Sequence, residues 1–389
     1  MHRVRPIHFL SQWQGGRLVD FSLSEEQVLL RDSVEKYVAE RCGVDRHRQL
    51  VNTELAFDPS AWTQFAELGW LAVPFGEQHG GFDGGPLEIM VMAEALGRGI
   101  VREPWLHTVV TCGALLQHAG SDEQQGHAIP GIIDGSTQWA FAFAERGSDF
   151  DLLNLATQAD ADGSAWRLSG KKIAVLNGHC AQRLIVSAST AAGPGLFLVD
   201  AEADGVSRES FVAVDGSKGA HITFETVAAE LLGESGQGQA CIERAINDAI
   251  IAIGGEALGA MQSLLQATVE YTGTRNQFGQ PISKFQVLQH RMAEMYIKVE
   301  ETRSLLLNAA IQLAEGSAAA TSACAALKVK VADAGRYVSQ EAVQLHGGIG
   351  MTDELSVGHH YKRLLLLSKL YGDEAFYLTR FSEAAAGAS

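Results

Sequence analysis

The sequence predicts a mainly α-helical protein with a β domain in its centre, and three observations lead to that expectation. Apolar residues recur at three- and four-residue spacing from about residue 21 to 133, and again from about residue 238 to the end. Between these stretches the chain breaks into short β-rich segments separated by clusters of Gly, Asp and Ser. The first spacing is typical of amphipathic helices and the second pattern of strands. The order of helices, strands and then helices narrows the choice of folds further.

The first helical stretch follows an N-terminal extension, residues 1–20, which lacks the apolar core of a signal peptide. Ser22 or Ser24 can cap a helix here, and two glutamates occupy the positively polarised first turn of that helix. Further amphipathic pieces lie on either side of a glycine turn at residues 79–81. We therefore predict an N-terminal helical domain over residues 21–135.

The middle of the chain has the pattern of a compact β domain, which we place at residues 136–235. Short segments of β-forming residues alternate there with turn residues, as in a domain built from antiparallel strands. The expected strands lie at residues 137–144, 166–168, 184–188, 196–199 and 220–224.

The last part of the chain, residues 236–389, is predicted to be helical again. Its apolar side chains recur at the spacing that a helix packed in a bundle requires. The clearest set is Phe285, Leu288, Met292, Met295, Tyr296 and Val299.

Composition excludes several classes of partner. The formal net charge is −16 and no run of Lys and Arg appears, so a nucleic-acid partner is not expected. No apolar run reaches the roughly 18 to 20 residues that span a bilayer. The five cysteines are far apart and lack the spacing of metal ligands, so we expect free thiols in a reducing cytoplasm and no metal.

One segment between two long helical stretches suits a phosphate-bearing cofactor. It reads RNQFGQ over residues 275–280. The forked donors of Arg275 match two phosphate oxygens, and Phe278 can stack on a heterocycle. Gln286 follows closely and adds an amide. Taken alone, the segment also fits an ordinary connection between helices.

A second segment, QLHGGIG over residues 344–350, ends another helical stretch. Gly347 and Gly348 allow a close backbone approach, and exposed amides there can meet an anion. Gln344 precedes them by one helical turn. Taken alone, this segment also fits a glycine cap at the end of a helix.

Together and in this order, the motifs resemble those of the acyl-CoA dehydrogenase family over residues 21–381. The resemblance implies an N-terminal helical domain, a middle antiparallel β domain and a C-terminal four-helix bundle. It rests on the segments FSLSEEQVLLRDSVEKYV, LGWLAVPFGEQHGG, AEALGRG, WRLSGKKIAVLNG, ITFETV, LLGESGQG, RNQFGQPISKFQVLQHRMAEM and QLHGGIGMTDELSVGHHYKR.

The resemblance also implies a function. Members are FAD-dependent oxidoreductases that form a double bond between the α and β carbons of an acyl-CoA thioester, and electron-transfer flavoprotein is the expected acceptor. Neighbouring subunits share the flavin, so the chain is expected to form at least a dimer and usually a tetramer. Arg363 lies in a region where members approach CoA, and we expect it to bind substrate. Carried over by position, the residues that reach a neighbour's FAD are Arg275, Phe278, Gln286, Gln344, Gly347 and Gly348.

The catalytic carboxylate of the family is missing from both of its usual positions. It is most often a Glu just after a Tyr in the final helical region, where this chain has Gly372. Some members place it on the first bundle helix, where this chain has Ala249. The catalytic residue that we predict is Asp373, although a one-residue shift turns a helical side chain by about 100°. Asp248 and Glu256 are the alternatives.

The residues expected beside the chain's own flavin also depart from the family pattern. Members usually have an aromatic and then a hydroxyl residue soon after the Lys of the GxK element, but here GKK is followed by IAV over residues 173–175. The loop that usually reads TEPxxGSD is AERGSD at residues 144–149, without its proline.

These departures lie on the chain's own catalytic side, whereas the neighbour-facing motifs are intact. The asymmetry resembles the smaller-subunit type of pimeloyl-CoA and steroid-side-chain dehydrogenases, in which two unlike chains pair and one supplies the base. We therefore expect a base-lacking subunit of a heterotetramer in fatty-acid or steroid catabolism. The alternatives are a homodimer or homotetramer that catalyses by itself, a flavin-fold enzyme with other chemistry such as oxygenation or desulfination, and a structural subunit that completes another chain's FAD site.

Overall fold

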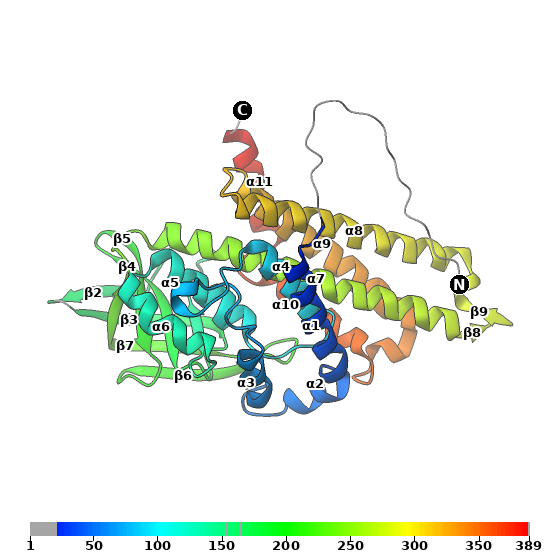
Figure 1. Cartoon of the computed structure of the whole chain (residues 1–389), viewed down its shortest axis with the longest axis horizontal. Helices are drawn as coiled ribbons and strands as arrows, with labels where there is room; N and C mark the ends of the chain where they lie inside the picture. Colours follow the sequence, from blue (N-terminus) through cyan, green and yellow to red (C-terminus); the bar gives the residue numbers. More distant parts are fainter. Residues whose placement is uncertain (1–21, 152–153, 164, 388–389) are drawn as a thin grey trace.

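The computed structural model describes residues 22–151, 154–163 and 165–387, and its long axis runs from a β domain to the far end of a helical bundle (Figure 1). The N-terminal helices lie across the centre, between these two parts. The predicted fold, mainly helical with a central β domain, is confirmed.

The N-terminal helices begin at the predicted cap. The Ser24 hydroxyl accepts a hydrogen bond from the backbone N–H of Gln27 at 3.1 Å, and the Gln27 side chain accepts one from the Ser24 N–H at 3.0 Å. This reciprocal pair satisfies two backbone donors that the helix leaves free. The helices are α1 (Glu25–Arg41), α2 (Val44–Leu50), α3 (Pro59–Glu67), α4 (Pro86–Gly97), α5 (Gly113–Ala119) and α6 (Asp122–Ile133), with a 3-10 turn at Glu77–His79 and a π-helical segment at Leu106–Cys112.

The β domain has seven strands in one sheet that curls back on itself. In the order β4-β2-β3-β7-β5 each strand pairs with the next, and β5 pairs with β4 again, while β1 and β6 add to β4 and β7. The enclosed side chains form a separate apolar core around Phe197 and Phe224. The strands are β1 (Trp139–Ala142), β2 (Gln158–Asp162), β3 (Ala165–Leu176), β4 (Arg183–Thr190), β5 (Gly193–Asp200), β6 (Val206–Val212) and β7 (Lys218–Leu232).

One feature of this sheet differs from the expected antiparallel arrangement. β1 runs parallel to β4, and β2 meets β4 through one further parallel pair. Parallel neighbours require a long connection between them. The hairpin of β2 and β3 lies in the chain between β1 and β4 and provides that length.

Within the described residues, the C-terminal part contains three long helices followed by two of 14 residues each. α7 to α10 pack on one another, and α11 packs on α9. A short two-stranded turn joins α7 to α8 at the far end of the bundle (Figure 1). The elements are α7 (Gly238–Thr274), β8 (Asn276–Gln277), β9 (Gln280–Pro281), α8 (Gln286–Ala314), α9 (Ala320–His346), α10 (Ser356–Lys369) and α11 (Glu374–Gly387), with 3-10 turns at Ile282–Lys284 and Gly347–Met351.

The N-terminal helices and the bundle share one apolar core. α4 and α7 approach closely at Gly255, where an added Cβ would lie 2.8 Å from the Cβ of Ala93 and 2.9 Å from the carbonyl oxygen of Met90. The absence of a side chain at this position lets the two helices touch through their backbones. Their contact fixes one wall of the cavity described below.

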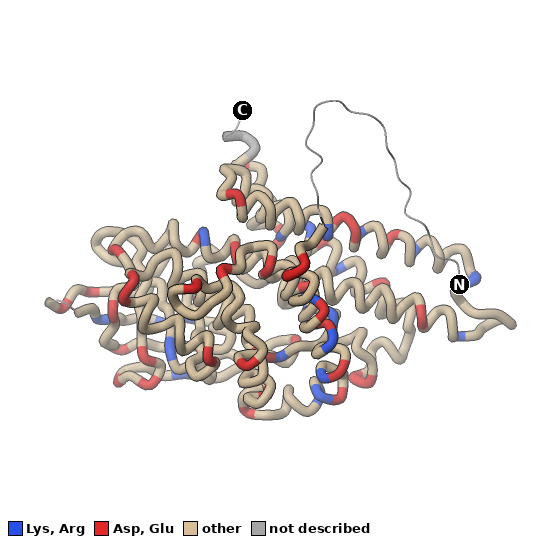
Figure 2. The backbone as a smooth tube through the Cα atoms, in the orientation of Figure 1, with Lys and Arg blue, Asp and Glu red and all other residues tan. Residues whose placement is uncertain are grey.

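The distribution of charged side chains agrees with the acidic composition of the chain. Figure 2 shows Asp and Glu spread over the β domain and the helices, whereas the tip formed by β8 and β9 is mostly uncharged. Within the described ranges, no helix combines the length and the apolar character that crossing a membrane requires.

Candidate functional site

Arg275 and Phe278 project from the β8–β9 turn at the end of the bundle. Phe278 is 91% exposed and has a φ of +52°, which the tight turn before Gly279 imposes. Its ring contacts Phe285 edge-on, with centroids 6.0 Å apart. Arg275 ends α7 and is exposed, and among the described residues no carboxylate lies within salt-bridge distance of its guanidinium. Gln286, the first residue of α8, is exposed at the same end.

The second glycine motif lies beside this turn. Tyr271, near the end of α7, stacks on His346, the last residue of α9, with ring centroids 4.6 Å apart. The stack brings the end of α7 next to Gly347 and Gly348, which are exposed. An added Cβ at either glycine would meet no atom within 4 Å, and Gly347 has a φ of +65°. Gln344 is also exposed, one turn earlier on α9.

The structure therefore gathers the predicted cofactor residues at one end of the molecule. An unpaired guanidinium, an exposed aromatic ring, two amides and open glycine backbone are the groups that hold a diphosphate and a stacked heterocycle. The set faces solvent, and the described residues form no opposite wall to it. It can therefore form only one side of a site.

The usual base position, Gly372, lies in a turn that has no room for a side chain. Its φ is +130°, and an added Cβ would lie 2.5 Å from Cε2 of Tyr377 and 2.7 Å from Cδ1 of Phe376. The turn is held in place because Tyr377 donates a hydrogen bond to the Tyr371 carbonyl at 2.9 Å and Lys328 donates one to the Gly372 carbonyl at 3.0 Å. A carboxylate at this position would require a different turn.

The two aspartates considered as substitutes for the base are engaged elsewhere. One oxygen of Asp373 accepts the N–H of Phe376 at 3.1 Å at the start of α11, and the other lies 3.0 Å from Nζ of Lys369. The Phe376 N–H, and then Lys369, hold the pKa of Asp373 below its usual range. Asp248 lies 2.8 Å from Nε2 of His118. A carboxylate whose ionised form is stabilised in this way, as that of Asp373 is, is a poor proton acceptor.

Along β3, the charged side chains hold the local backbone. Lys172 is fully buried and donates to Glu145 at 2.6 Å and to the Ser187 hydroxyl at 3.1 Å. Burial lowers the pKa of Lys172 to about 8, and Glu145 partly offsets that effect. The residues that follow, IAV at 173–175, have no hydroxyl. This stretch offers no side-chain hydrogen bond to a ligand.

Arg363 lies in the interior, where the three parts of the chain meet. Its guanidinium contacts Glu256 of α7 at 2.5 and 3.0 Å and Asp215 of the β6–β7 turn at 2.9 Å. Burial would lower the pKa of Arg363, but these two carboxylates raise it. Arg102 donates to the Asp215 carbonyl at 2.9 Å, so four charged side chains form one network. Each guanidinium nitrogen of the predicted substrate-binding residue thus already donates to a carboxylate of this chain.

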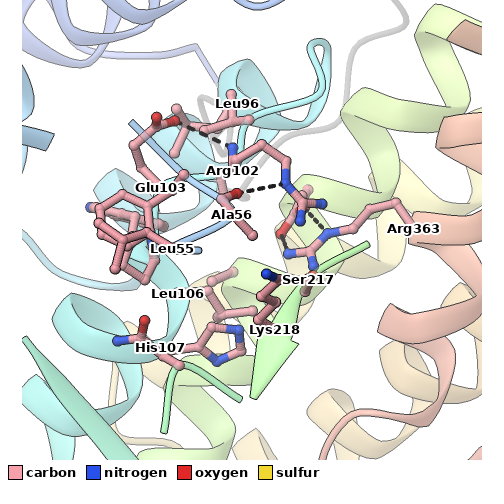
Figure 3. A pocket seen from close by; sticks show the side chains of 18 of the residues that line it. Leu55, Ala56, Leu96, Arg102, Glu103, Leu106, His107, Ser217, Lys218 and Arg363 are labelled. Carbon is pink, nitrogen blue, oxygen red and sulfur yellow. Dashed lines mark hydrogen bonds and ion pairs between the residues drawn. The ribbon is translucent and has the colours of Figure 1, made fainter. Parts of the chain in front are cut away.

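This network borders a cavity that motif reading did not predict. The cavity lies between α4, α7 and the β6–β7 turn, and it also reaches Trp105 and His107 (Figure 3). Its residues come from widely separated positions and form no local pattern. Among the described residues, no group of three or more His, Cys, Asp or Glu is placed to hold a metal ion. All five cysteines are free thiols.

Comparison with known proteins agrees with this architecture along nearly the whole chain. Models of the N-terminal, middle and C-terminal domains of acyl-CoA dehydrogenase match residues 24–136, 140–227 and 236–385. The chain belongs to the acyl-CoA dehydrogenase family. Mitochondrial isovaleryl-CoA dehydrogenase from Pongo abelii is 30% identical to it, over 95% of this chain and 90% of the relative.

Two solved structures that resemble this chain are each named as a pair of proteins. A chain of the ChsE4-ChsE5 complex from Mycobacterium tuberculosis is 27% identical with a TM-score of 0.87, covering 95% of this chain and 99% of that chain. A chain of a Tcur3481-Tcur3483 steroid ACAD variant is 30% identical with a TM-score of 0.87, covering 94% and 98%. The resemblance inferred from the motifs is confirmed.

Proposed function

We propose that this chain is the base-lacking subunit of a heteromeric, FAD-dependent acyl-CoA dehydrogenase. The proposal rests on a contrast between the neighbour-facing residues and the two usual base positions. The neighbour-facing residues are exposed together at the end of the bundle, whereas Gly372 and the buried Ala249 leave both usual base positions without a carboxylate. A dehydrogenation site needs a base and a flavin in register. This chain is suited to supply one side of the flavin site to a partner.

The exposed end of the bundle fits the diphosphate and adenosine of an FAD held by the partner. Arg275 would bind the diphosphate through its fork of N–H donors, and Phe278 would stack on the adenine. Gly347 and Gly348 would let the backbone approach the phosphates, while Gln286 and Gln344 would donate amide hydrogen bonds. When bound, FAD supplies the acceptor for the hydride that leaves the β carbon of the acyl group.

The chain's own side fits the flavin ring less well. The IAV segment at residues 173–175 offers no hydroxyl at the place where members of the family usually contact the ring. The carboxylates that could replace the missing base, Asp373, Asp248 and Glu256, each have a cationic or histidine partner within 3.0 Å. The base would then come from the partner, as would most contacts to the ring.

The likeness to two-component assemblies supports the heteromeric form. The matched chains come from the ChsE4-ChsE5 complex and from the Tcur3481-Tcur3483 steroid ACAD, each of which is named as a pair of proteins. If the chain belongs to such a heteromeric dehydrogenase, the substrate is an acyl-CoA with a fatty or steroid acyl group. Electrons would pass to an electron-transfer flavoprotein.

The proposal is tested by purifying the tagged chain alone and with the acyl-CoA dehydrogenase homologue that co-purifies from its source organism. We expect little flavin absorbance near 450 nm for the chain alone. In the complex we expect bound FAD, and bleaching when acyl-CoA is added. Full FAD occupancy and rapid bleaching of the chain alone would contradict the proposal.

A variant tests the half-site itself. Arg275→Met in the complex should weaken FAD binding by about tenfold or more, because a forked charge-assisted contact is worth about 1.5–3 kcal/mol. Arg48→Met, at an exposed position of α2, is the matched control and should leave FAD binding unchanged. Equal FAD affinity in both variants would argue against the neighbour-facing role of Arg275.

A further inference from the structure

The proposed half-site consists of two parts that lie on different helices. Arg275 and Phe278 follow the last turn of α7, and Gly347 and Gly348 follow the last turn of α9. The two helices pack on each other in the bundle (Figure 1). A single diphosphate can contact both parts only if the distance between these two helix ends is held constant.

The rings of Tyr271 and His346 join the two helix ends. Their centroids are 4.6 Å apart and their planes are inclined by 25°, so the rings lie face to face. An aromatic pair contributes stability beyond the area that it buries, whereas a helix end without such a contact frays. The stack therefore ties the last turn of α7 to the last turn of α9.

The His346 ring is itself fixed within α9. It is buried, and its Nδ1 donates a hydrogen bond to the Ala342 carbonyl at 2.8 Å. The backbone that follows folds back over this residue, because an added Cβ at Gly350 would lie 3.0 Å from the Cβ of His346 and 2.9 Å from the Val343 carbonyl oxygen. The position of the ring therefore determines where the glycine segment begins.

On the α7 side, Tyr271 lies one helical turn before Arg275. The Tyr271 carbonyl accepts the Arg275 N–H at 2.9 Å at the end of the helix. The Arg275 carbonyl in turn accepts the Ile282 N–H at 2.8 Å. The backbone of Arg275 is thus held on both sides, and a displacement of Tyr271 would move Arg275 with it.

Two other contacts near this end orient α8 and do not replace the stack. Arg291 of α8 donates to Glu341 of α9 at 3.0 Å. The Thr272 hydroxyl of α7 lies 3.4 Å from the sulfur of Met292 on α8. Neither contact joins α7 directly to α9, as the stacked rings do.

We propose that Tyr271 and His346 are positioning residues of the half-site, which set the distance between the Arg275 guanidinium and the glycine backbone at residues 347–348. This inference rests on the proposed function, because it assigns a role to residues that lie beside the FAD-contacting groups. Neither ring needs to touch FAD. Both act on its diphosphate through the groups whose separation they fix.

A double-mutant cycle separates positioning from a general structural role. FAD is removed from the complex of this chain with its partner, and rebinding is followed by the quenching of flavin fluorescence. Tyr271→Leu should raise the Kd for FAD by about three- to tenfold, because the aromatic pair is lost. Tyr271→Phe keeps the ring and should bind FAD as the wild type does. In the Arg275→Met background, Tyr271→Leu should cause no further loss, since the group that it positions is gone.

Tyr361→Leu on α10 is the matched control. Tyr361 is half-buried, as Tyr271 is, and stacks on no ring among the described residues, so its replacement should leave the Kd for FAD unchanged. Circular dichroism and the thermal midpoint show whether each variant is folded. If Tyr271→Leu does not fold, His346→Leu removes the other ring and serves in the same cycle. Loss of fold in both variants would indicate a general structural role and overturn the proposal.

The outcomes distinguish this inference from the proposed function. Wild-type affinity in Tyr271→Leu, an equal loss in Tyr361→Leu, or losses that add in the double variant would each overturn the positioning role. If Arg275→Met loses FAD while Tyr271→Leu does not, the positioning role fails and the half-site stands. If Arg275→Met binds FAD as the wild type does, the half-site fails and the positioning role fails with it.

Discussion

At the scale of single residues, the backbone and the surroundings of Gly372 both exclude a side chain at this position. Its backbone has a φ of +130°, a region that residues with a side chain rarely adopt. The rings of Phe376 and Tyr377 also occupy the place of a Cβ. The absence of a carboxylate at position 372 therefore follows from the packing of the turn, and a single substitution there would have to overcome that packing.

We expect Gly372→Glu to destabilise the chain and not to create a dehydrogenase. Backbone strain and overpacking together should lower the free energy of unfolding by at least about 2 kcal/mol. Urea denaturation measures this change, and flavin bleaching by acyl-CoA tests the activity. A stable Gly372→Glu chain that bleaches its flavin would show that the turn can rearrange.

Gly273→Ala is a matched control, because Gly273 lies near the end of α7 and an added Cβ there would meet no atom within 4 Å. This substitution should stabilise the chain by roughly 0.5–1 kcal/mol, since alanine loses less backbone entropy in a helix.

Single residues also show how much of the candidate site could be predicted from the sequence. Arg275, Phe278 and the glycines at 347 and 348 belong to local motifs, and the structure gathers them at one end of the bundle. The ion pair of Arg363 with Asp215 joins residues 148 positions apart, and no local pattern identifies it. The same holds for His107, which lines a cavity that exists only in the folded chain.

At the scale of elements, the end of α10 depends on one buried lysine of α9. Lys328 donates to the carbonyls of Leu367 at 2.8 Å, Ser368 at 3.0 Å and Gly372 at 3.0 Å. The last carbonyls of a helix have no partner within it. The lysine supplies that partner and also fixes the turn that follows. Burial lowers its pKa to about 7.

Lys328→Met should therefore lower the free energy of unfolding by about 3 kcal/mol or more, because it leaves buried carbonyls without donors. Lys362→Met on α10 is the control, since Lys362 is partly exposed and, among the described residues, has Asp353 at 3.4 Å as its one ion-pair partner. Surface ion pairs contribute little, so the control should change stability by less than about 1 kcal/mol. Chemical denaturation measures both changes. Equal stability of the two variants would contradict the proposed role of Lys328.

Periodicity predicted the helices of the bundle well, because their apolar stripes face a large core. It predicted the strands less completely. β7 covers residues 218–232, whereas only residues 220–224 were expected, and Thr226 within it has a φ of +58°. The parallel pairing of β1 with β4 depends on the path of the chain between them. Strand propensity contains no information about that path.

At the scale of the whole molecule, the three parts of the chain meet around buried histidines. The rings of His47 of α2 and His359 of α10 lie 4.4 Å apart, and Asp215 of the β domain is close to both. Burial lowers the pKa of His47 to about 3, and the pKa of His360 to about 4. Nδ1 of His47 is buried without a hydrogen-bond partner.

These pKa values predict that acid loosens the junction. In the unfolded chain a histidine has a pKa near 6.5, so the unfolded state binds more protons as the pH falls below that value. Stability is complete above about pH 6.5 and decreases until the pH reaches the folded pKa values of 3 to 4. Each buried histidine should contribute a slope of about 1 kcal/mol per pH unit between pH 6 and 4.5. Arg102 and Arg363 face the cluster and oppose its protonation, whereas Asp215 and Glu256 favour it.

His360→Leu should therefore flatten the dependence of the unfolding free energy on pH by about 1 kcal/mol per unit between pH 6 and 4.5. Denaturation midpoints measured at several pH values give this slope. His290→Gln, at an exposed position of α8, should keep the slope of the wild type. Because His360 belongs to the interface of three domains, its protonation should separate them before the β domain itself unfolds. Probes in each part would then report different midpoints at low pH, and a single shared midpoint would contradict this order.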